Sequence, residues 1–215
     1  MPKDIWLDGN LTDESKDIPM MIGSTFAERT TNAFAYVMGG EYTPKNEMTD
    51  EEVDAALEEM YGDQKGAVVE AFKEAYPDKP IVDALYVDLT AYRQSVLDAA
   101  NKKADQGGAP VYNYVFAMEF PTMGGWLPWH CSEIPYVFHN LDIVDLPYGG
   151  PSEAEEKLSD IMCDAWVSFA KTGDPNHEGM IEWPAYTTEE GAAMIFDAES
   201  SIGNHHDAKL IELIG

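Results

Sequence analysis

A histidine in an aromatic loop is the residue of this sequence best suited to proton transfer. His130 lies in the stretch WLPWHCSEIPYVFHN, residues 126 to 140, and a carboxylate, Glu133, follows three residues later. Three interpretations are open: a metal ligand, a core histidine held by a backbone carbonyl, or the base of a hydrolase. As a base, its imidazole would need a nucleophilic hydroxyl at one ring nitrogen and a carboxylate at the other.

The other potential metal ligands give little support for a metal site. Cys131 and Cys163 have no CxxC spacing, so neither a zinc site nor a disulfide framework is indicated. His205 and His206, in NHHD, could bind a metal adventitiously, but adjacent side chains point in different directions on a strand or helix. We therefore expect no metal and no cofactor.

The charge of the chain bears on its partners. Acidic residues outnumber basic ones by 40 to 13, which gives a formal charge of −27 over 215 residues. Such a charge repels nucleic acid and anionic membrane surfaces, so neither is expected as a partner. No apolar run is long enough for a transmembrane helix. The first residues lack the regions of a signal peptide, and this favours a cytoplasmic location.

Three short apolar segments predict the strands that would position His130. Residues 17–24 form an apolar run bounded by proline and glycine, residues 109–120 are aromatic and β-branched, and residues 192–197 form a last short run. Their near-continuous apolar character is typical of strands covered on both faces, as in a parallel sheet.

Amphipathic segments between these strands predict the helices. Two of them begin with capping-box spacing, at Thr49 and Glu52 and again at Ser152 and Glu155. The helices are expected within residues 49–62, 66–79, 88–108 and 151–176, with a small helix in the polar tail.

The order of elements predicts an α/β layered fold. The helix within 88–108 would present one apolar stripe to the core, namely Leu89, Tyr92, Val96 and Ala100. About three strong strands are fewer than the roughly five or six typical of a sheet. The chain, residues 1–215, therefore looks like the second half of a larger sheet with an open strand edge that something must cover.

Six segments, in the same order, resemble the C-terminal part of the type-B carboxylesterase family, which includes para-nitrobenzyl esterases and cholinesterases. They are IPMMIGSTFAE, PVYNYVFAMEF, HCSEIPYVFHNLD, DAWVSFAKTGDPN, WPAY and MIFD, between about residues 17 and 197. The resemblance implies the C-terminal half of an α/β-hydrolase sheet, with about three core strands flanked by helices. It also implies that the family's reaction is the hydrolysis of carboxylic esters.

The same resemblance implies roles for three residues. Glu28 in IGSTFAE takes the place of the acid of the catalytic triad, and His130 takes the place of the catalytic histidine. Glu133 matches a second carboxylate that supports the site and is not a triad member. The acid precedes the histidine, as it does in α/β-hydrolases.

The nucleophile of that family has no counterpart in this sequence. No Gly-x-Ser-x-Gly occurs, and none of the nine serines follows a predicted strand in a glycine-bounded elbow. Ser24 only precedes the acid in the family pattern, so we do not expect it to be the nucleophile. The glycine-rich oxyanion loop is also absent, so this chain alone should not hydrolyse esters by the family mechanism.

Two functions from different classes remain open. The chain is either the C-terminal portion of a serine carboxylesterase, inactive until an N-terminal esterase half complements it, or a non-catalytic binding or dimerisation module. In the first case the substrate is a small carboxylic ester, and in the second a homodimer forms through the exposed strand edge. The aromatic loop, residues 118–129, could line a substrate pocket or simply pack under its own loop.

Overall fold

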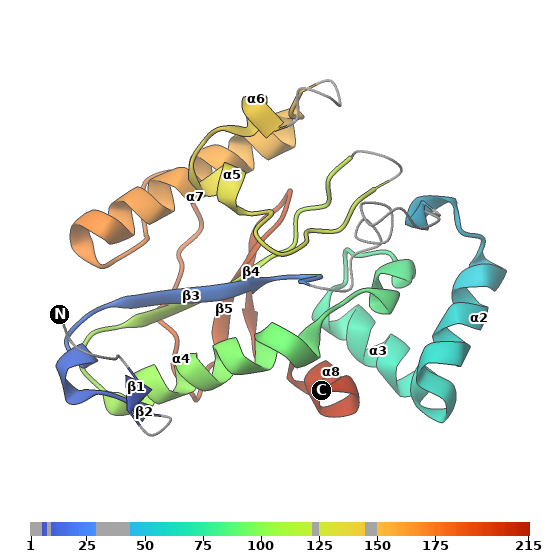
Figure 1. Cartoon of the computed structure of the whole chain (residues 1–215), viewed down its shortest axis with the longest axis horizontal. Coiled ribbons are helices and arrows are strands. Elements are labelled where there is room, and N and C mark those ends of the chain that lie inside the picture. The colour runs from blue at the N-terminus through green and yellow to red at the C-terminus, as the bar shows by residue number, and fades with distance from the viewer. Residues whose placement is uncertain (1–5, 8–9, 29–43, 122–124, 145–149) are drawn as a thin grey trace.

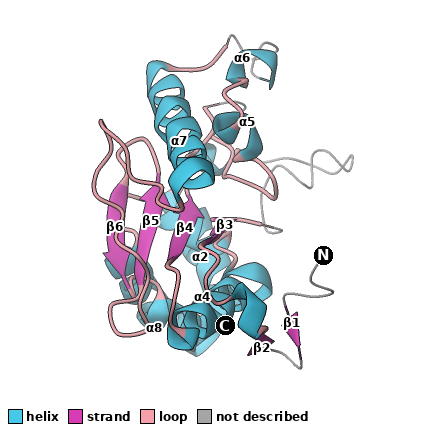
Figure 2. Ribbon diagram, turned by 90° about the vertical axis from the view of Figure 1, so that its left-hand side faces the viewer, coloured by secondary structure: helices cyan, strands magenta, loops and turns pink. Residues whose placement is uncertain are grey.

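A four-stranded sheet forms the centre of the molecule. The computed structural model describes residues 6–7, 10–28, 44–121, 125–144 and 150–215. The strand order is β3-β4-β5-β6, and Figure 2 shows the four strands side by side. β3 (Met20–Thr25), β4 (Val111–Phe116) and β5 (Ala192–Phe196) are parallel, and β6 (Ser201–Asn204) is antiparallel to β5. The fold is therefore α/β, as the sequence predicts.

The three predicted strands are confirmed as β3, β4 and β5, but the sheet has one strand more. The sequence predicts a polar tail after residue 197, and the structure places residues 201–204 of that tail in β6. The reason is visible in the burial of this strand, whose two end residues are exposed and whose two middle residues are only half-buried. An edge strand of this kind lacks the apolar run that marks a central strand. A further pair of short strands, β1 (Trp6–Leu7) and β2 (Asn10–Leu11), lies outside the main sheet.

Helices cover both faces of the sheet (Figure 1). On one side lie α5 (Ile134–Val137), α6 (Leu141–Val144) and the long α7 (Glu153–Thr172). On the other lie α2 (Asp50–Tyr61), α3 (Lys65–Ala75), α4 (Gln94–Gln106) and α8 (Ala208–Ile214). Short 3₁₀ helices η1 to η4 span Asp13–Ser15, Lys45–Glu47, Gly62–Gln64 and Ile81–Leu85.

Both predicted capping boxes are confirmed. The Thr49 hydroxyl accepts from the Glu52 backbone N–H, and Ser152 and Glu155 repeat the arrangement at the start of α7. The helix expected over 88–108 is divided, because a π-helix, η5 (Leu89–Arg93), precedes α4.

The alternation of side chains along β4 divides the core into two layers. Tyr112, Tyr114 and Phe116 join the cluster that contains Leu158 and Met162 of α7. Val115 points the other way and joins the cluster built mainly by α2, α3 and the segment around η4. Because successive residues of a strand face opposite sides, one strand contributes to both layers. The sheet is thus buried on both faces, which explains the apolar character of its central strands.

The outer edge of β3 carries no further strand among the residues that the structure describes. No helix in these described parts of the chain combines the length and apolar character that crossing a membrane requires.

Candidate active site

The sheet brings Glu28 and His130 together, although 102 positions separate them in the sequence. β3 ends at Thr25 and leads into the turn that carries Glu28, while His130 follows β4 after a longer loop. The two strands are parallel neighbours, so both residues leave the sheet at its carboxyl edge. That is the edge at which ligands bind to open α/β sheets.

Backbone hydrogen bonds fix both loops relative to the sheet. The Phe26 N–H donates to the Phe116 carbonyl at 2.8 Å, so the ladder between the strands continues into the turn of Glu28. The His130 N–H donates to the Glu28 carbonyl at 3.2 Å, and the Ala27 N–H donates to the Pro128 carbonyl at 3.1 Å. The relative position of the two functional residues is therefore set by their main chains.

The Glu28 carboxylate holds one edge of the imidazole. Its Oε2 lies 2.7 Å from Nδ1 of His130, and its Oε1 accepts from the Thr25 N–H at 2.9 Å. An ionised carboxylate only accepts hydrogen bonds, so Nδ1 carries the proton in this pair. Nε2 is then left with its lone pair, as a general base requires.

Burial differs sharply between the two partners. The Glu28 side chain is only 7% exposed, whereas the His130 side chain is 61% exposed. The acid is therefore enclosed behind the histidine, and the imidazole faces outward. Within the described residues, no hydrogen bond engages its Nε2. This arrangement suits a histidine that exchanges a proton with a group brought to it from outside.

Glu133 lies close to this pair without bonding to the imidazole. It is the N-cap residue of α5, and its main-chain carbonyl accepts from the N–H groups of Tyr136 and Val137. Burial raises the pKa of the Glu133 carboxyl, and the nearby charge of Glu28 raises it further. Its Oε2 has no hydrogen-bond partner among the described residues. The structure thus places all three residues identified from the sequence in one region.

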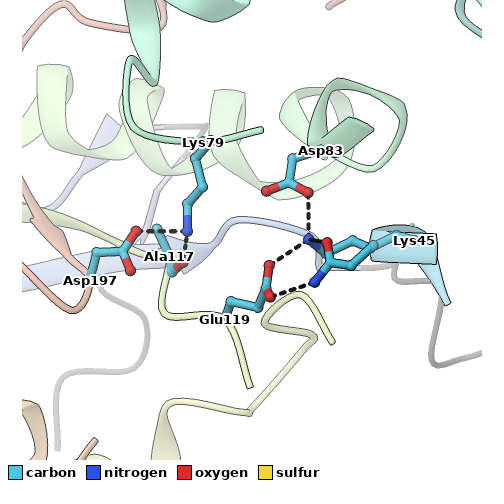
Figure 3. A network of polar contacts seen from close by, with 7 residues as sticks. Lys45, Lys79, Asp83, Ala117, Glu119 and Asp197 are labelled. Carbon is cyan, nitrogen blue, oxygen red and sulfur yellow. Dashed lines mark hydrogen bonds and ion pairs between the residues drawn. The ribbon is translucent and has the colours of Figure 1, made fainter. Parts of the chain in front are cut away.

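The loop that carries His130 is anchored on a polar network (Figure 3). Glu119, just after β4, forms an ion pair with Lys45 at 2.5 Å, and Lys45 also lies 2.8 Å from a carboxylate oxygen of Asp83. Beyond Glu119, Phe120 and Trp126 pair across the loop through two backbone hydrogen bonds.

The described part of the aromatic loop serves mainly as packing. Phe120 and Trp126 are buried, and both contact the layer under α7. Trp129 is half-buried and lies against the rings of both. Residues 122–124, which belong to the same predicted loop, lie outside the described residues.

The sequence interpretation missed one residue of this region, Tyr92. Its ring is stacked on the imidazole of His130, whereas the apolar stripe predicted a core position. Tyr92 is half-buried, while Leu89, Val96 and Ala100 of the same stripe are buried. A helical periodicity that assumes 3.6 residues per turn fails at η5, because a π-helix has a wider turn.

No three histidine, cysteine or carboxylate side chains of the described residues come together in a way that could hold a metal ion. The side chains of His205 and His206 point in different directions. The His206 ring lies against Tyr76 in the interior, whereas the exposed His205 has its Nε2 3.1 Å from the Glu189 carbonyl.

A largely parallel sheet that carries an acid and a histidine on loops at its carboxyl edge is typical of part of an α/β-hydrolase, and comparison with known proteins agrees. The model of the carboxylesterase family matches residues 7–213. The chain therefore belongs to the carboxylesterase family.

Individual relatives show how much of the family architecture is present. Para-nitrobenzyl esterase of Bacillus subtilis is 30% identical over 196 residues, which cover 89% of this chain and 37% of that protein. Phenmedipham hydrolase of Pseudarthrobacter oxydans is 26% identical, with coverages of 86% and 37%. A solved esterase of Clostridium hathewayi, described as hydrolysing aliphatic aromatic polyesters, superimposes on this chain with a TM-score of 0.84. The two sequences are 36% identical, and the match covers 94% of this chain and 38% of the esterase chain. The chain thus spans less than two fifths of these relatives.

Proposed function

We propose that this chain is the acid- and histidine-bearing portion of a serine carboxylesterase. The observation that carries the proposal is the 2.7 Å contact between Glu28 and Nδ1 of an outward-facing His130. The serine and the oxyanion loop would come from an N-terminal portion of the kind that makes up the remainder of the longer relatives. Without that portion, the chain is expected to be inactive.

In the complete site, His130 acts as the general base. Its Nε2 takes the proton of the serine hydroxyl as the oxygen attacks the ester carbonyl, and the resulting imidazolium is stabilised by Glu28. His130 then gives the proton to the departing alcohol, which leaves an acyl-enzyme. Water then attacks the acyl group while His130 takes its proton, and His130 returns that proton to the serine oxygen as the carboxylic acid leaves. Glu133 has no proton-transfer step in this scheme and supports the site.

The proposed substrates are small carboxylic esters with an apolar portion. They follow from family membership, since the relatives include para-nitrobenzyl esterase. We propose the cytoplasm as its compartment, because Cys131 and Cys163 are both free thiols and fit a reducing environment.

A chimera tests the proposal. The N-terminal portion of the Clostridium hathewayi esterase, up to the strand that matches β3, is fused to this chain and assayed with a chromogenic short-chain ester. We expect hydrolysis by the chimera and its loss in His130→Ala. Glu28→Gln, which keeps the shape of the acid and removes its charge, should lower kcat by about 10⁴, as in other triads.

His139→Asn is the matched control, because His139 is an exposed histidine whose ring pairs with Asp160 and asparagine tolerates its positive φ of 49°. Its activity should equal that of the parent chimera. A chimera that folds cooperatively and yet hydrolyses no ester would refute the proposed function.

The alternative function is a dimerisation module that uses the open edge of β3. Light scattering on the isolated chain separates the two proposals. A stable homodimer that does not dissociate when an N-terminal esterase portion is added favours the module, and a chain that assembles with that portion favours the esterase.

A further inference from the structure

The face of the His130 imidazole is covered by a second aromatic ring. The rings of Tyr92 and His130 lie nearly parallel, with centroids 5.6 Å apart and planes inclined by 25°. Glu28 occupies the Nδ1 edge of the same imidazole. We propose that Tyr92 is a positioning residue that fixes the plane of the His130 ring and stabilises the imidazolium that forms when His130 takes the proton of the serine. The catalytic consequence rests on the proposed function, whereas the positioning itself does not.

The residue after Tyr92 is anchored in the interior. Arg93 is buried, its Nε donates to Oδ2 of Asp207 at 2.6 Å, and its Nη1 donates to Oδ1 of Asn113 at 2.8 Å. Asn113 in turn donates to the Ile22 carbonyl at 3.0 Å. Burial tends to raise the pKa of Asp207, but the Arg93 charge holds it below its usual value. The ion pair therefore stays charged and ties η5 to both β3 and β4.

The start of this segment is tied to the turn that carries the acid. The Asp88 N–H donates to the Phe26 carbonyl at 2.9 Å, two residues before Glu28. Tyr92 thus lies between an anchor on the acid's turn and an anchor in the sheet. Its position relative to the Glu28–His130 pair is consequently fixed by main-chain and buried polar contacts.

The π-helical geometry explains why Tyr92 reaches His130. In a continuous α-helix, Tyr92 would lie on the stripe of Leu89 and Val96, three and four residues away. The i→i+5 hydrogen bonding of η5 inserts an extra residue into the turn and displaces Tyr92 from that stripe. Single π-helical turns of this kind occur frequently at functional sites.

The chemistry of the stacked pair favours the charge that forms during catalysis. A neutral imidazole gains little electrostatic energy from a phenol face, whereas an imidazolium is attracted by its quadrupole. Glu28 stabilises that charge from the Nδ1 edge and Tyr92 stabilises it from the ring face. Nε2 lies on the remaining edge, where a serine can approach.

A spectroscopic experiment on the isolated chain tests the positioning. In NMR spectra of the chain with labelled histidine, the ring current of Tyr92 should shift the ring protons of His130 upfield. The ring nitrogens should report a single tautomer, with the proton on Nδ1. Tyr92→Leu should abolish the upfield shift and Tyr92→Phe should preserve it, while the Glu28 contact should keep the Nδ1–H tautomer in both variants. Tyr61→Leu, which removes a half-buried tyrosine on α2, is the control that should leave the His130 signals in place.

Two results would overturn the inference. One is a set of His130 ring-proton shifts that Tyr92→Leu leaves unchanged, and the other is their loss in Tyr92→Phe, which would assign the effect to the hydroxyl. If Tyr92→Leu does not fold, nuclear Overhauser effects between the two rings in the unmodified chain decide the question. Their presence supports the stacking, and their absence contradicts it.

The esterase chimera supplies the kinetic readout. Tyr92→Leu should lower kcat roughly two- to fivefold, the range expected for one exposed cation–π contact, without changing KM, and Tyr92→Phe should restore kcat. An unchanged kcat in Tyr92→Leu would contradict a role in catalysis. An inactive chimera would count against the proposed function, and the spectra of the isolated chain would still decide the role of Tyr92.

Discussion

The glycine at position 23 is required by its neighbour in the sheet. Gly23 of β3 lies opposite Tyr114 of β4, and a Cβ atom added to it would come within 2.4 Å of the tyrosine ring. We predict that Gly23→Ala destabilises the protein by about 1–3 kcal/mol, the usual cost of overpacking. Urea unfolding measures the change, and a loss of stability that Tyr114→Ala relieves would identify the ring as the cause.

Gly66 provides the matched control for this substitution. It lies in the first turn of α3, and an added Cβ atom would meet nothing within 4 Å. Gly66→Ala should therefore stabilise the chain by roughly 0.5–1 kcal/mol, because alanine loses less backbone entropy than glycine in a helix. Equal effects of the two substitutions would contradict the steric explanation for Gly23.

At the scale of single residues, the sequence was most informative where the chemistry is tied to a strand end. The resemblance to the carboxylesterase family implied Glu28 and His130 as partners, and both follow predicted strands, whose carboxyl ends lie together when the strands are parallel neighbours. Tyr92 could not be placed beside them, since its approach to His130 depends on a π-helical turn that apolar periodicity does not reveal.

At the scale of elements, the ion-pair network in Figure 3 joins three segments that are remote in sequence. Lys45 of η2 lies between Asp83 of η4 and Glu119 on the His130 loop, and the side chains of Lys45 and Asp83 are fully buried. Burial raises the pKa of Asp83, although the Lys45 charge opposes this rise. The lysine therefore offsets part of the cost of burying this carboxylate and attaches the loop at the same time.

We predict that Lys45→Met is strongly destabilising at neutral pH, by about 3–5 kcal/mol, because it leaves the buried Asp83 without a compensating charge. The loss should be smaller at acid pH, where Asp83 takes up a proton. Hydrogen exchange should show faster opening of the backbone pair between Phe120 and Trp126, which Glu119 precedes.

The double variant Lys45→Met/Asp83→Asn tests the cause of that loss. Since it removes both charges, it should recover most of the stability. If the double variant is as unstable as Lys45→Met alone, the lost packing of the lysine chain is responsible and the uncompensated charge is not.

The helices and strands were predictable to different degrees for physical reasons. The starts of helices α2 and α7 can be predicted from their capping boxes, because each box depends on two residues only three positions apart. β6 has no such local signal, because an edge strand is held by its neighbour β5 and keeps exposed polar ends. β6 forms because it pairs with β5 in the folded protein, and a local sequence pattern does not reveal such pairing.

At the scale of the whole molecule, stability toward acid depends on a histidine in the interior. Burial, with a smaller contribution from the Arg93 charge, lowers the pKa of His206 to about 4. The unfolded chain takes up this proton near the ordinary pKa of about 6.5, whereas the folded chain resists it until about pH 4. Stability is therefore lost as the pH falls through this window, by an amount on the order of 3 kcal/mol.

We predict that His206→Phe flattens the loss of stability between pH 6.5 and 4. Phenylalanine keeps the edge-to-face contact with Tyr76, whose ring centroid lies 5.3 Å from that of the imidazole, and it has no proton to gain. Thermal unfolding across this pH range is the measurement. His205→Asn is the control, because His205 is exposed and asparagine tolerates its positive φ of 46°. A control variant that flattens the curve equally would contradict the assignment to His206.

The last prediction concerns the open edge of β3 as the place where a partner chain docks. The Met20 N–H donates to the Pro110 carbonyl and the Phe26 N–H donates to the Phe116 carbonyl, at the two ends of β4. Because N–H directions alternate along a strand, the N–H of Met21 points away from β4, to the open edge. Met21→Pro should leave the sheet intact, since proline is tolerated where the N–H faces away from the ladder. It should abolish assembly with an N-terminal esterase portion supplied as a separate chain, or the homodimer if one forms.

Ile22→Pro is the counterpart, because its N–H points toward β4 and its loss should unfold the chain. Circular dichroism verifies that Met21→Pro is folded, and light scattering measures its assembly. Assembly of Met21→Pro with unchanged affinity would mean that the partner docks elsewhere. The next positions to substitute would then be Ile134 and Phe138, two exposed apolar residues that follow His130 in the α5 region. A serine that reaches Nε2 of His130 must bring its own chain close to them.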